Sequence, residues 1–232
     1  VENNIEYIRQ EYGMGAMEFA EYCGIARPKT VFAHGIYFSD EDIAKLARTG
    51  VSVAHCPSCN SKLAMGVARV PDMLNAGVNV CLATDSAMVN NANDMIREMW
   101  YALMLHRITR MDPTYPTAET VLEMATVRGA KALGMEDQVG SLEPGKKADI
   151  ILIDLKKPHL TPMHDPVSTL VFSANGSDVD TVIVNGKILM RERRVLTLEE
   201  EQIIERAQEI APTIRSYAQR KIKEKWPVER AT

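Results

Sequence analysis

Residues 30–55 read TVFAHGIYFSDEDIAKLARTGVSVAH, and this stretch decides the fold. It begins with an apolar run that has the length and the β-branched content of a strand. Ser39 and Asp42 then form the capping box of a helix, which we expect to end at Gly50. A second apolar run, residues 51–55, follows at once. The order strand, helix, strand predicts a crossover unit of a parallel sheet.

The flanking sequence continues this alternation. Residues 78–85 read VNVCLATD and predict a third apolar strand. Helices are expected over four further stretches, residues 4–21 (broken at Gly13 and Gly15), 70–76, 93–110 and 117–133. The apolar face of the third of these helices is formed by Ile96, Met99, Trp100, Leu103 and Ile108. Strands that are apolar throughout are typical of a parallel sheet covered by helices on both faces.

The composition argues against several classes of function. The 232 residues carry a net charge of -4 and show no basic stripe, so nucleic-acid binding has no electrostatic support. No apolar run approaches the roughly 18 residues of a membrane span, and we expect no signal peptide. Four cysteines are too few for a disulfide scaffold, which predicts a reducing, cytoplasmic environment.

The pattern changes after Gly134, where a turn-rich segment begins. Apolar strands are expected over residues 148–155 and 179–184, and Asn185-Gly186 predicts a two-residue hairpin turn into a return strand over residues 187–190. A capping box then opens a last helix, residues 198–223. Its apolar stripe is Ile203, Ile204, Ala207, Ile210 and Ile214.

Each predicted parallel strand leads into a residue capable of chemistry: His34, His55 and Asp85. In a parallel α/β barrel, catalytic side chains lie at the carboxyl ends of the strands. The residues alone leave two interpretations open, because Asp85 is either a ligand at a barrel mouth or the cap of a turn or helix. His34 is likewise either a site residue or a structural histidine, and His55 gives a weaker signal. The other histidines, His106, His159 and His164, are expected to be structural or exposed.

Cys56 and Cys59 form a Cys-x-x-Cys pair that we interpret as two small buried thiols. A closed zinc site needs four ligands and usually a second such pair. The cytidine-deaminase pattern needs Pro before the pair and a His-x-Glu, and neither is present. A redox pair is also disfavoured, because residues 57–60 read as a loop and the pair does not open a clear helix.

The motifs taken together resemble the amidohydrolase superfamily, in its cytosine-deaminase-like branch. The resemblance rests on FAHG at residues 32–35, VAHCPSCN at 53–60 with Lys62-Leu63 and Gly66, AGV at 76–78, Thr84-Asp85, GSLEPGKKAD at 140–149 and VNGK at 184–187. That branch includes methylthioadenosine/S-adenosylhomocysteine deaminases, guanine deaminases and triazine hydrolases. The chain departs from the pattern at Ala83 and Ser86, where relatives commonly have glycine.

The resemblance implies a fold in three parts. Residues 1–139 would be about strands six to eight of a metal-dependent (β/α)8 TIM barrel, 140–195 part of a β-sandwich domain and 196–232 a C-terminal helix. A complete barrel takes about 250 residues, so the chain is expected to be a truncated piece. Because a catalytic metal site needs about three protein ligands and one is identifiable here, the isolated chain is expected to bind no stoichiometric metal.

The resemblance also implies residue roles. Asp85 matches the aspartate after strand eight, which binds the metal and accepts a proton from the attacking water. His34 matches the histidine after strand six, which hydrogen-bonds the water or the substrate, while His55 and Asn60 would shape the strand-seven loop. The substrate-binding set is therefore Asp85, His34 and Ser86, with Asp85 the one metal ligand in this chain.

The function implied is hydrolytic deamination of a purine nucleoside or related aminated heterocycle with release of ammonia. The cofactor would be one divalent ion, zinc or iron, with zinc favoured. Alternatives are a triazine chloro- or aminohydrolase, a guanine or cytosine deaminase and, from another class, a non-catalytic subunit or inactive fragment. The expected partners are a small heterocyclic substrate and further copies of the chain, with no nucleic acid and no membrane.

Overall fold

The computed structural model describes residues 2–219 and the side chains of residues 5–214. A three-stranded sheet forms its first part: β1 (Val31–Ala33), β2 (Ser52–His55) and β3 (Val80–Leu82). All three strands run parallel, with β2 in the centre and Val53 paired with both Phe32 and Val80. The predicted parallel sheet is confirmed, and the carboxyl ends of its strands share one edge.

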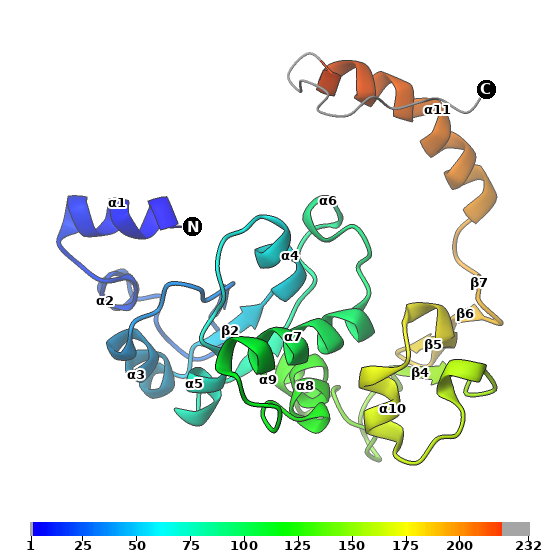
Figure 1. Ribbon diagram of the computed structural model, residues 1–232, viewed down its shortest axis with the longest axis horizontal. Helices are drawn as coiled ribbons and strands as arrows, with labels where there is room; N and C mark the ends of the chain where they lie inside the picture. The colour runs from blue at the N-terminus through cyan, green and yellow to red at the C-terminus, as the bar shows by residue number, and fades with distance from the viewer. Residues whose placement is uncertain (1, 220–232) are drawn as a thin grey trace.

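Helices alternate with these strands along the chain (Figure 1). They are α1 (Glu2–Tyr12), α2 (Ala16–Tyr22), α3 (Asp40–Thr49), α4 (Pro57–Lys62), α5 (Val70–Asn75), α6 (Ala87–Asn90), α7 (Met95–Arg110), α8 (Ala118–Ala125) and α9 (Val127–Ala132). The capping box that begins α3 is present, with the Ser39 hydroxyl accepting from Asp42 N, and Gly50 ends the helix with φ 71°. The crossover unit read from residues 30–55 is therefore confirmed in detail.

Two local predictions are wrong, and one short helix was not predicted. Residues 57–62, expected as a loop, form α4, and residues 87–90 form α6. Pro57 stands at the start of α4, where its missing N–H costs nothing, but so short a helix shows no apolar periodicity in the sequence. The single helix expected over residues 117–133 is broken at Thr126, whose φ of -126° and ψ of -94° leave the helical region.

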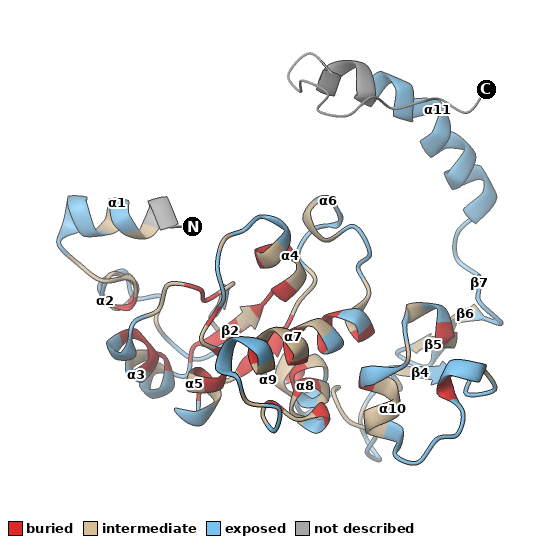
Figure 2. Ribbon diagram, in the orientation of Figure 1, coloured by how far each residue is buried: buried red, intermediate tan, exposed pale blue. Residues whose placement is uncertain are grey.

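The core lies between the parallel sheet and the helices that cover it (Figure 2). On α7, Ile96, Met99 and Leu103 are buried as predicted. The prediction was wrong for Trp100, which is 41% exposed, and for Ile108, which is 67% exposed. Ile108 lies about half a turn around the helix from Met99, at roughly 100° per residue, so the two side chains cannot face the same core.

The second part of the chain is an antiparallel sheet in the order β4 (Ile150–Ile153), β5 (Val179–Val184), β6 (Lys187–Arg191) and β7 (Arg194–Val195). Asn185 and Gly186 connect β5 to β6 with φ 49° and 76°, as the predicted hairpin turn requires. The sequence did not predict β7, the helix α10 (Pro166–Phe172) or the 3-10 turns η1 (Pro158–Leu160) and η2 (Gly176–Asp178).

The two parts are joined through α10 and the N-terminus of α7. Helix α10 packs against α7 and α8, and its Val171 is fully buried in the main core. Asp94 uses one carboxylate oxygen to cap α7, accepting from Ile96 N at 2.9 Å. Its other oxygen accepts from Gly176 N at 2.8 Å. One carboxylate thus fixes both the start of α7 and the turn that precedes β5.

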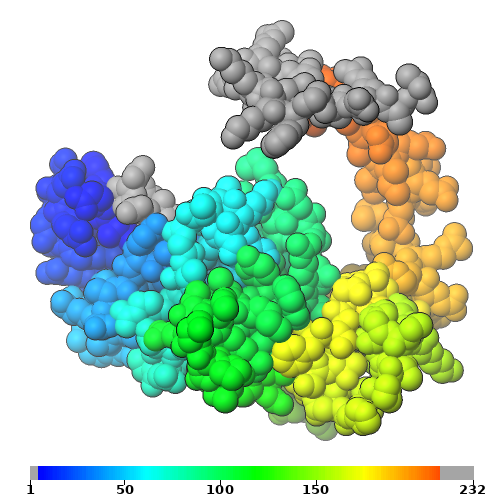
Figure 3. Space-filling model, in the orientation of Figure 1, coloured from blue at the N-terminus to red at the C-terminus, as the bar shows by residue number. Residues whose placement is uncertain are grey.

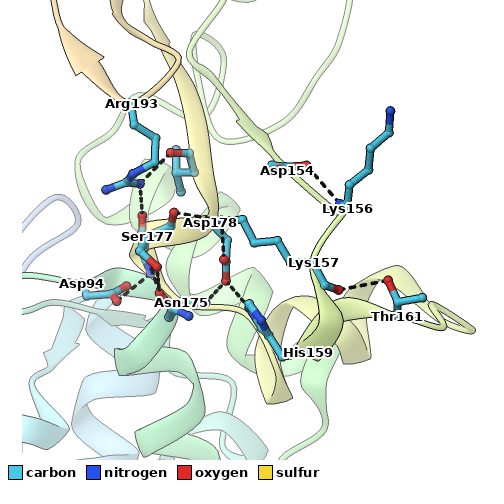
Figure 4. Close-up of polar contacts among 12 residues, drawn as sticks. Asp94, Asp154, Lys156, Lys157, His159, Thr161, Asn175, Ser177, Asp178 and Arg193 are labelled. Atoms are coloured by element: carbon cyan, nitrogen blue, oxygen red, sulfur yellow. Dashed lines mark hydrogen bonds and ion pairs between the residues drawn. The ribbon is translucent and has the colours of Figure 1, made fainter.

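A buried carboxylate, Asp178, organises the turn before β5 (Figure 4). Its side chain is 1% exposed and lies 2.8 Å from Lys157 Nζ and 3.0 Å from His159 Nε2. Burial alone would raise the pKa of Asp178. The hydrogen bonds from Lys157, His159 and the backbone of Asn175 outweigh burial and hold the pKa at about 2.

This network predicts a pH-dependent contribution to stability. Because the folded-state pKa of Asp178 lies below its ordinary value of 3.8, the contribution is present above pH 3.8 and is lost as the pH falls towards 2. We expect it to be worth about 2 kcal/mol and to be absent from Asp178→Asn. Urea unfolding of both proteins at pH values across this window measures the difference. An identical pH dependence in the two would contradict the role of Asp178.

The last described helix, α11 (Glu200–Gln219), projects from the antiparallel sheet (Figures 1 and 3). The apolar stripe predicted for it is exposed, with Ile204 at 60% and Ile214 at 64%. Residues 220–223 of the expected helix lie outside the described residues. Among residues 2–219, no helix has the length and hydrophobicity that crossing a bilayer requires.

Candidate functional site

Polar side chains from three segments meet at the carboxyl edge of the parallel sheet. His34 directly follows β1, Cys59 lies in α4 just beyond β2, and Asp85 follows β3. One ligand-type atom from each of the three lies within 4.8 Å of the others. The structure therefore brings together His34 and Asp85, as predicted, and adds Cys59, which the sequence interpretation had set aside.

The backbone at both predicted site residues is unusual. His34 has φ 70° and Asp85 has φ 62°, in the left-handed region that residues other than glycine seldom adopt. Gly35 continues the turn after β1, and a Cβ there would meet Val53 Cγ1 at 2.7 Å, so only glycine fits. Such conformations persist only where the surrounding structure stabilises them, and they cluster at functional sites.

Asp85 holds an ionised carboxylate that accepts two hydrogen bonds. Its Oδ2 accepts from the Cys59 thiol at 2.9 Å, and its Oδ1 accepts from Ser86 N at 2.7 Å. These two hydrogen bonds, that of Cys59 first, lower the pKa of Asp85. In the described part of the chain no lysine or arginine pairs with this carboxylate, and its side chain is 31% exposed. The site thus presents an anion to solvent.

His34 is oriented by Asn60. Its Nδ1 lies 2.8 Å from Asn60 Oδ1, and an amide oxygen can only accept, so Nδ1 carries the proton. The other ring nitrogen, Nε2, then faces Asp85 Oδ2 at 3.8 Å. Asn60 itself is fully buried, which fixes the position of its amide and so of the imidazole ring.

The contact between Cys59 and Asp85 was not predicted from the sequence. The prediction that Cys59 is a small buried thiol is confirmed, since it is 1% exposed. Burial, followed by the hydrogen bond to Asp85, raises the pKa of the Cys59 thiol to about 12, so at neutral pH it remains a hydrogen-bond donor. Asp85 follows a different strand, β3, so the spacing within the motif at residues 53–60 cannot indicate that Cys59 contacts it.

Comparison with known proteins identifies the group to which this architecture belongs. Residues 2–189 match the Amidohydrolase family. The chain belongs to that family. The resemblance drawn from residues 32–85 and 140–187 is confirmed, and so is the expected fold, a portion of an amidohydrolase barrel followed by a small β unit.

Curated relatives of this amidohydrolase chain are deaminases. It is 47% identical over 207 residues to a 5-methylthioadenosine/S-adenosylhomocysteine deaminase from Desulforudis audaxviator, covering 89% of this chain and 48% of the relative. It is 48% identical over 204 residues to a 5'-deoxyadenosine deaminase from Methanosarcina mazei, covering 88% and 47%. The chain therefore spans about half the length of the relatives it matches.

Solved structures of the same family contain zinc. An adenosine deaminase from Xanthomonas campestris with bound zinc superimposes with a TM-score of 0.88 at 31% identity, covering 91% of this chain and 48% of that one. An atrazine chlorohydrolase from Arthrobacter aurescens complexed with zinc gives a TM-score of 0.82 at 28% identity, covering 90% and 46%.

The remaining strand-end residue of the amidohydrolase sheet, His55, does not join the cluster. It is fully buried, and its Nε2 lies 3.0 Å from Nε2 of His106, a buried residue of α7. Burial and then the neighbouring histidines lower the pKa of His55, and burial followed by Arg110 lowers that of His106 to about 4. Both rings are therefore neutral at pH 7, and the pair ties β2 to α7.

Ser86 stands at the start of α6, beside the site. Its backbone N–H holds Asp85, and α6 is in turn fixed to α4 by Lys62 Nζ, which donates to Met88 O at 3.0 Å. Buried Glu98 supports both segments, accepting from Ser58 N at 3.2 Å and from Asn90 Nδ2 at 2.7 Å. The substrate-binding role of Ser86 stays a prediction.

The residues present fit a divalent cation. Asp85 offers an exposed, ionised carboxylate that pairs with no lysine or arginine of the described residues, and a carboxylate oxygen is a ligand that zinc accepts. The Cys59 sulfur lies 2.9 Å from Asp85 Oδ2, on the same side of the site.

Proposed function

We propose that the full-length protein containing this chain is a zinc-dependent amidohydrolase that deaminates an adenine nucleoside of the 5'-methylthioadenosine or S-adenosylhomocysteine type. The observation that carries the proposal is the convergence of His34 and Asp85 at the carboxyl edge of the parallel sheet, with Asp85 ionised and paired with no lysine or arginine among the described residues. Support for the substrate class comes from deaminase relatives at 41–48% identity.

The proposed reaction replaces the exocyclic amino group of the purine by oxygen. Water attacks the ring carbon that bears the amino group, and the carbon–nitrogen bond breaks. One proton of the water leaves on ammonia, and the other stays on the oxopurine product. A zinc ion held in part by Asp85 would lower the pKa of the water to about 7. Asp85 accepts the proton of the attacking water.

His34 has a separate task in this scheme. Because Nδ1 donates to Asn60, the lone pair of Nε2 faces the space beside Asp85, where it accepts a hydrogen bond from the attacking water and orients it. The exposed edge at Ser86 borders the same space, so we place substrate contacts there. The other half of the catalytic set lies outside residues 1–232 in this proposal.

A triazine hydrolase is the second candidate. The observation in its favour is the TM-score of 0.82 to the atrazine chlorohydrolase from Arthrobacter aurescens. Its identity of 28% is well below the 47% shared with the Desulforudis deaminase, so the deaminase is preferred.

The test is an ammonia-release screen of the zinc-loaded full-length gene product. The substrates are 5'-methylthioadenosine, S-adenosylhomocysteine, 5'-deoxyadenosine, adenosine, guanine, cytosine and a chlorotriazine, the last also assayed for chloride. We expect ammonia from the adenine nucleosides with kcat/KM of at least about 10⁴ M⁻¹s⁻¹. Chloride release without nucleoside deamination would select the triazine hydrolase, and no turnover would favour a non-catalytic subunit.

A further inference from the structure

Helix α4 (Pro57–Lys62) supports both residues of the candidate site. Its adjacent residues Cys59 and Asn60 contact Asp85 and His34 respectively, at 2.9 Å and 2.8 Å. Both supporting side chains are buried, at 1% and 0% exposure, so neither can move without disturbing the core. Helix α4 thus fixes the positions of His34, which follows β1, and Asp85, which follows β3, relative to each other.

The geometry of the Cys59 contact is that of a hydrogen bond rather than of two ligands on one metal. The Cys59 Sγ and Asp85 Oδ2 atoms lie 2.9 Å apart. Two ligands of one tetrahedral zinc, at Zn–S of about 2.3 Å and Zn–O of about 2.0 Å, would lie about 3.5 Å apart. The shorter separation places a proton between sulfur and oxygen.

The contact also constrains the carboxylate. Ser86 N fixes Oδ1 and Cys59 fixes Oδ2, so the rotation of the carboxylate about its last bond is set by two donors on opposite oxygens. Each oxygen keeps a further lone pair for a cation or a proton. Groups that hydrogen-bond a metal ligand in this way set its orientation and commonly change metal affinity or activity by about 10- to 100-fold.

We propose that Cys59 is a positioning residue, whose S–H···O hydrogen bond holds Asp85 in the orientation that binds the divalent cation, and that Cys59 is not itself a ligand. This inference rests on the proposed function, because it assumes that Asp85 binds zinc. Cys59, one of the two cysteines of the Cys-x-x-Cys pair, thereby has a role in the site.

Cys56 provides a matched control. It is a buried thiol three residues away on the same segment, 3% exposed, but its sulfur donates to Ala54 O at 3.7 Å and does not touch Asp85. Cys56→Ala therefore reports the effect of removing a buried sulfur near the site. Cys59→Ala removes the donor, and Cys59→Ser keeps an O–H donor in its place.

The experiment uses these three variants and the wild-type full-length protein. Zinc affinity is measured by competition with a chromophoric chelator, and kcat and KM by ammonia release from 5'-methylthioadenosine. We expect Cys59→Ala to lower zinc affinity and kcat by about 10- to 100-fold each with little change in KM. Cys59→Ser is expected to restore most of both, and Cys56→Ala to match the wild type. Thermal unfolding of the zinc-free proteins checks the fold, and Cys59→Val replaces Cys59→Ala if that variant does not fold.

Two results would overturn the positioning role. One is a zinc affinity and kcat for Cys59→Ala equal to those of Cys56→Ala. The other is a thiolate-to-metal charge-transfer band in the cobalt-substituted wild type that disappears in Cys59→Ser, which would make Cys59 a ligand. Either result, obtained with a wild type that binds zinc and releases ammonia, leaves the proposed function standing. A wild type that does neither refutes both.

Discussion

Replacing Asp85 by alanine in the full-length protein is expected to remove bound zinc and to lower deamination by more than about 1,000-fold. The loss should exceed the roughly 10- to 100-fold effect of residues that only support a ligand, because Asp85 is proposed both to bind the cation and to accept the proton of water. Zinc content by elemental analysis and ammonia release from 5'-methylthioadenosine measure the two effects separately.

Asp72→Ala is the control for that experiment. Asp72 is also an aspartate in a polar cluster, paired with Arg69 and Arg110, but it belongs to α5 and has no part in the site. It should keep zinc and turnover. The isosteric Asp85→Asn keeps the shape of the side chain and loses its charge, so it should behave like Asp85→Ala. Retained turnover in either Asp85 variant would contradict the assignment.

Replacing His34 by alanine is expected to lower kcat by about 100- to 10,000-fold, the range typical of groups that transfer or stabilise a proton in the transition state. Zinc content should change little, because the ligand we assign in this chain is Asp85. The combination of retained metal and lost turnover distinguishes His34 from Asp85, and the same two assays report it.

His164→Ala serves as the histidine control, since His164 lies exposed in a loop of the second part of the chain. It should match the wild type in both assays. Loss of zinc from His34→Ala would show that His34 is a ligand, and unchanged kcat would remove it from the reaction altogether.

The parallel sheet could be predicted from the sequence because its signals are local and agree with one another. The apolar runs before His34, His55 and Asp85, the capping box at Ser39 and the stop at Gly50 all specify the same element order. The turn at Asn185-Gly186 is equally local, because two successive residues with positive φ favour Asn and Gly.

Two short helices, α4 and α6, were not predicted from the sequence. Helix α4 has six residues and α6 has four, too few to show a period of 3.6. The burial of α7 was predicted only in part, because apolar residues such as Ile108 also occur on exposed faces. Helices α8 and α9 both contact β3, and the residues at the break between them, Ala125, Thr126 and Val127, include no Gly or Pro that would signal it.

The site was predicted as separate residues, without its contacts. Strand ends and the family motif indicated His34 and Asp85, and a parallel topology brings such ends together. The hydrogen bonds from Cys59 to Asp85 and from His34 to Asn60 depend on the path of α4, which was predicted as a loop. The pairing of His55 with His106 likewise joins two residues 51 positions apart in sequence.

The most direct measurement of the central claim is anomalous diffraction at the zinc edge from crystals of the full-length protein. We expect a zinc peak at about 2.0–2.2 Å from a carboxylate oxygen of Asp85, with the Cys59 sulfur beyond bonding distance. Zinc bound elsewhere, with the Asp85 side chain turned towards solvent or serving only to cap α6, would contradict it.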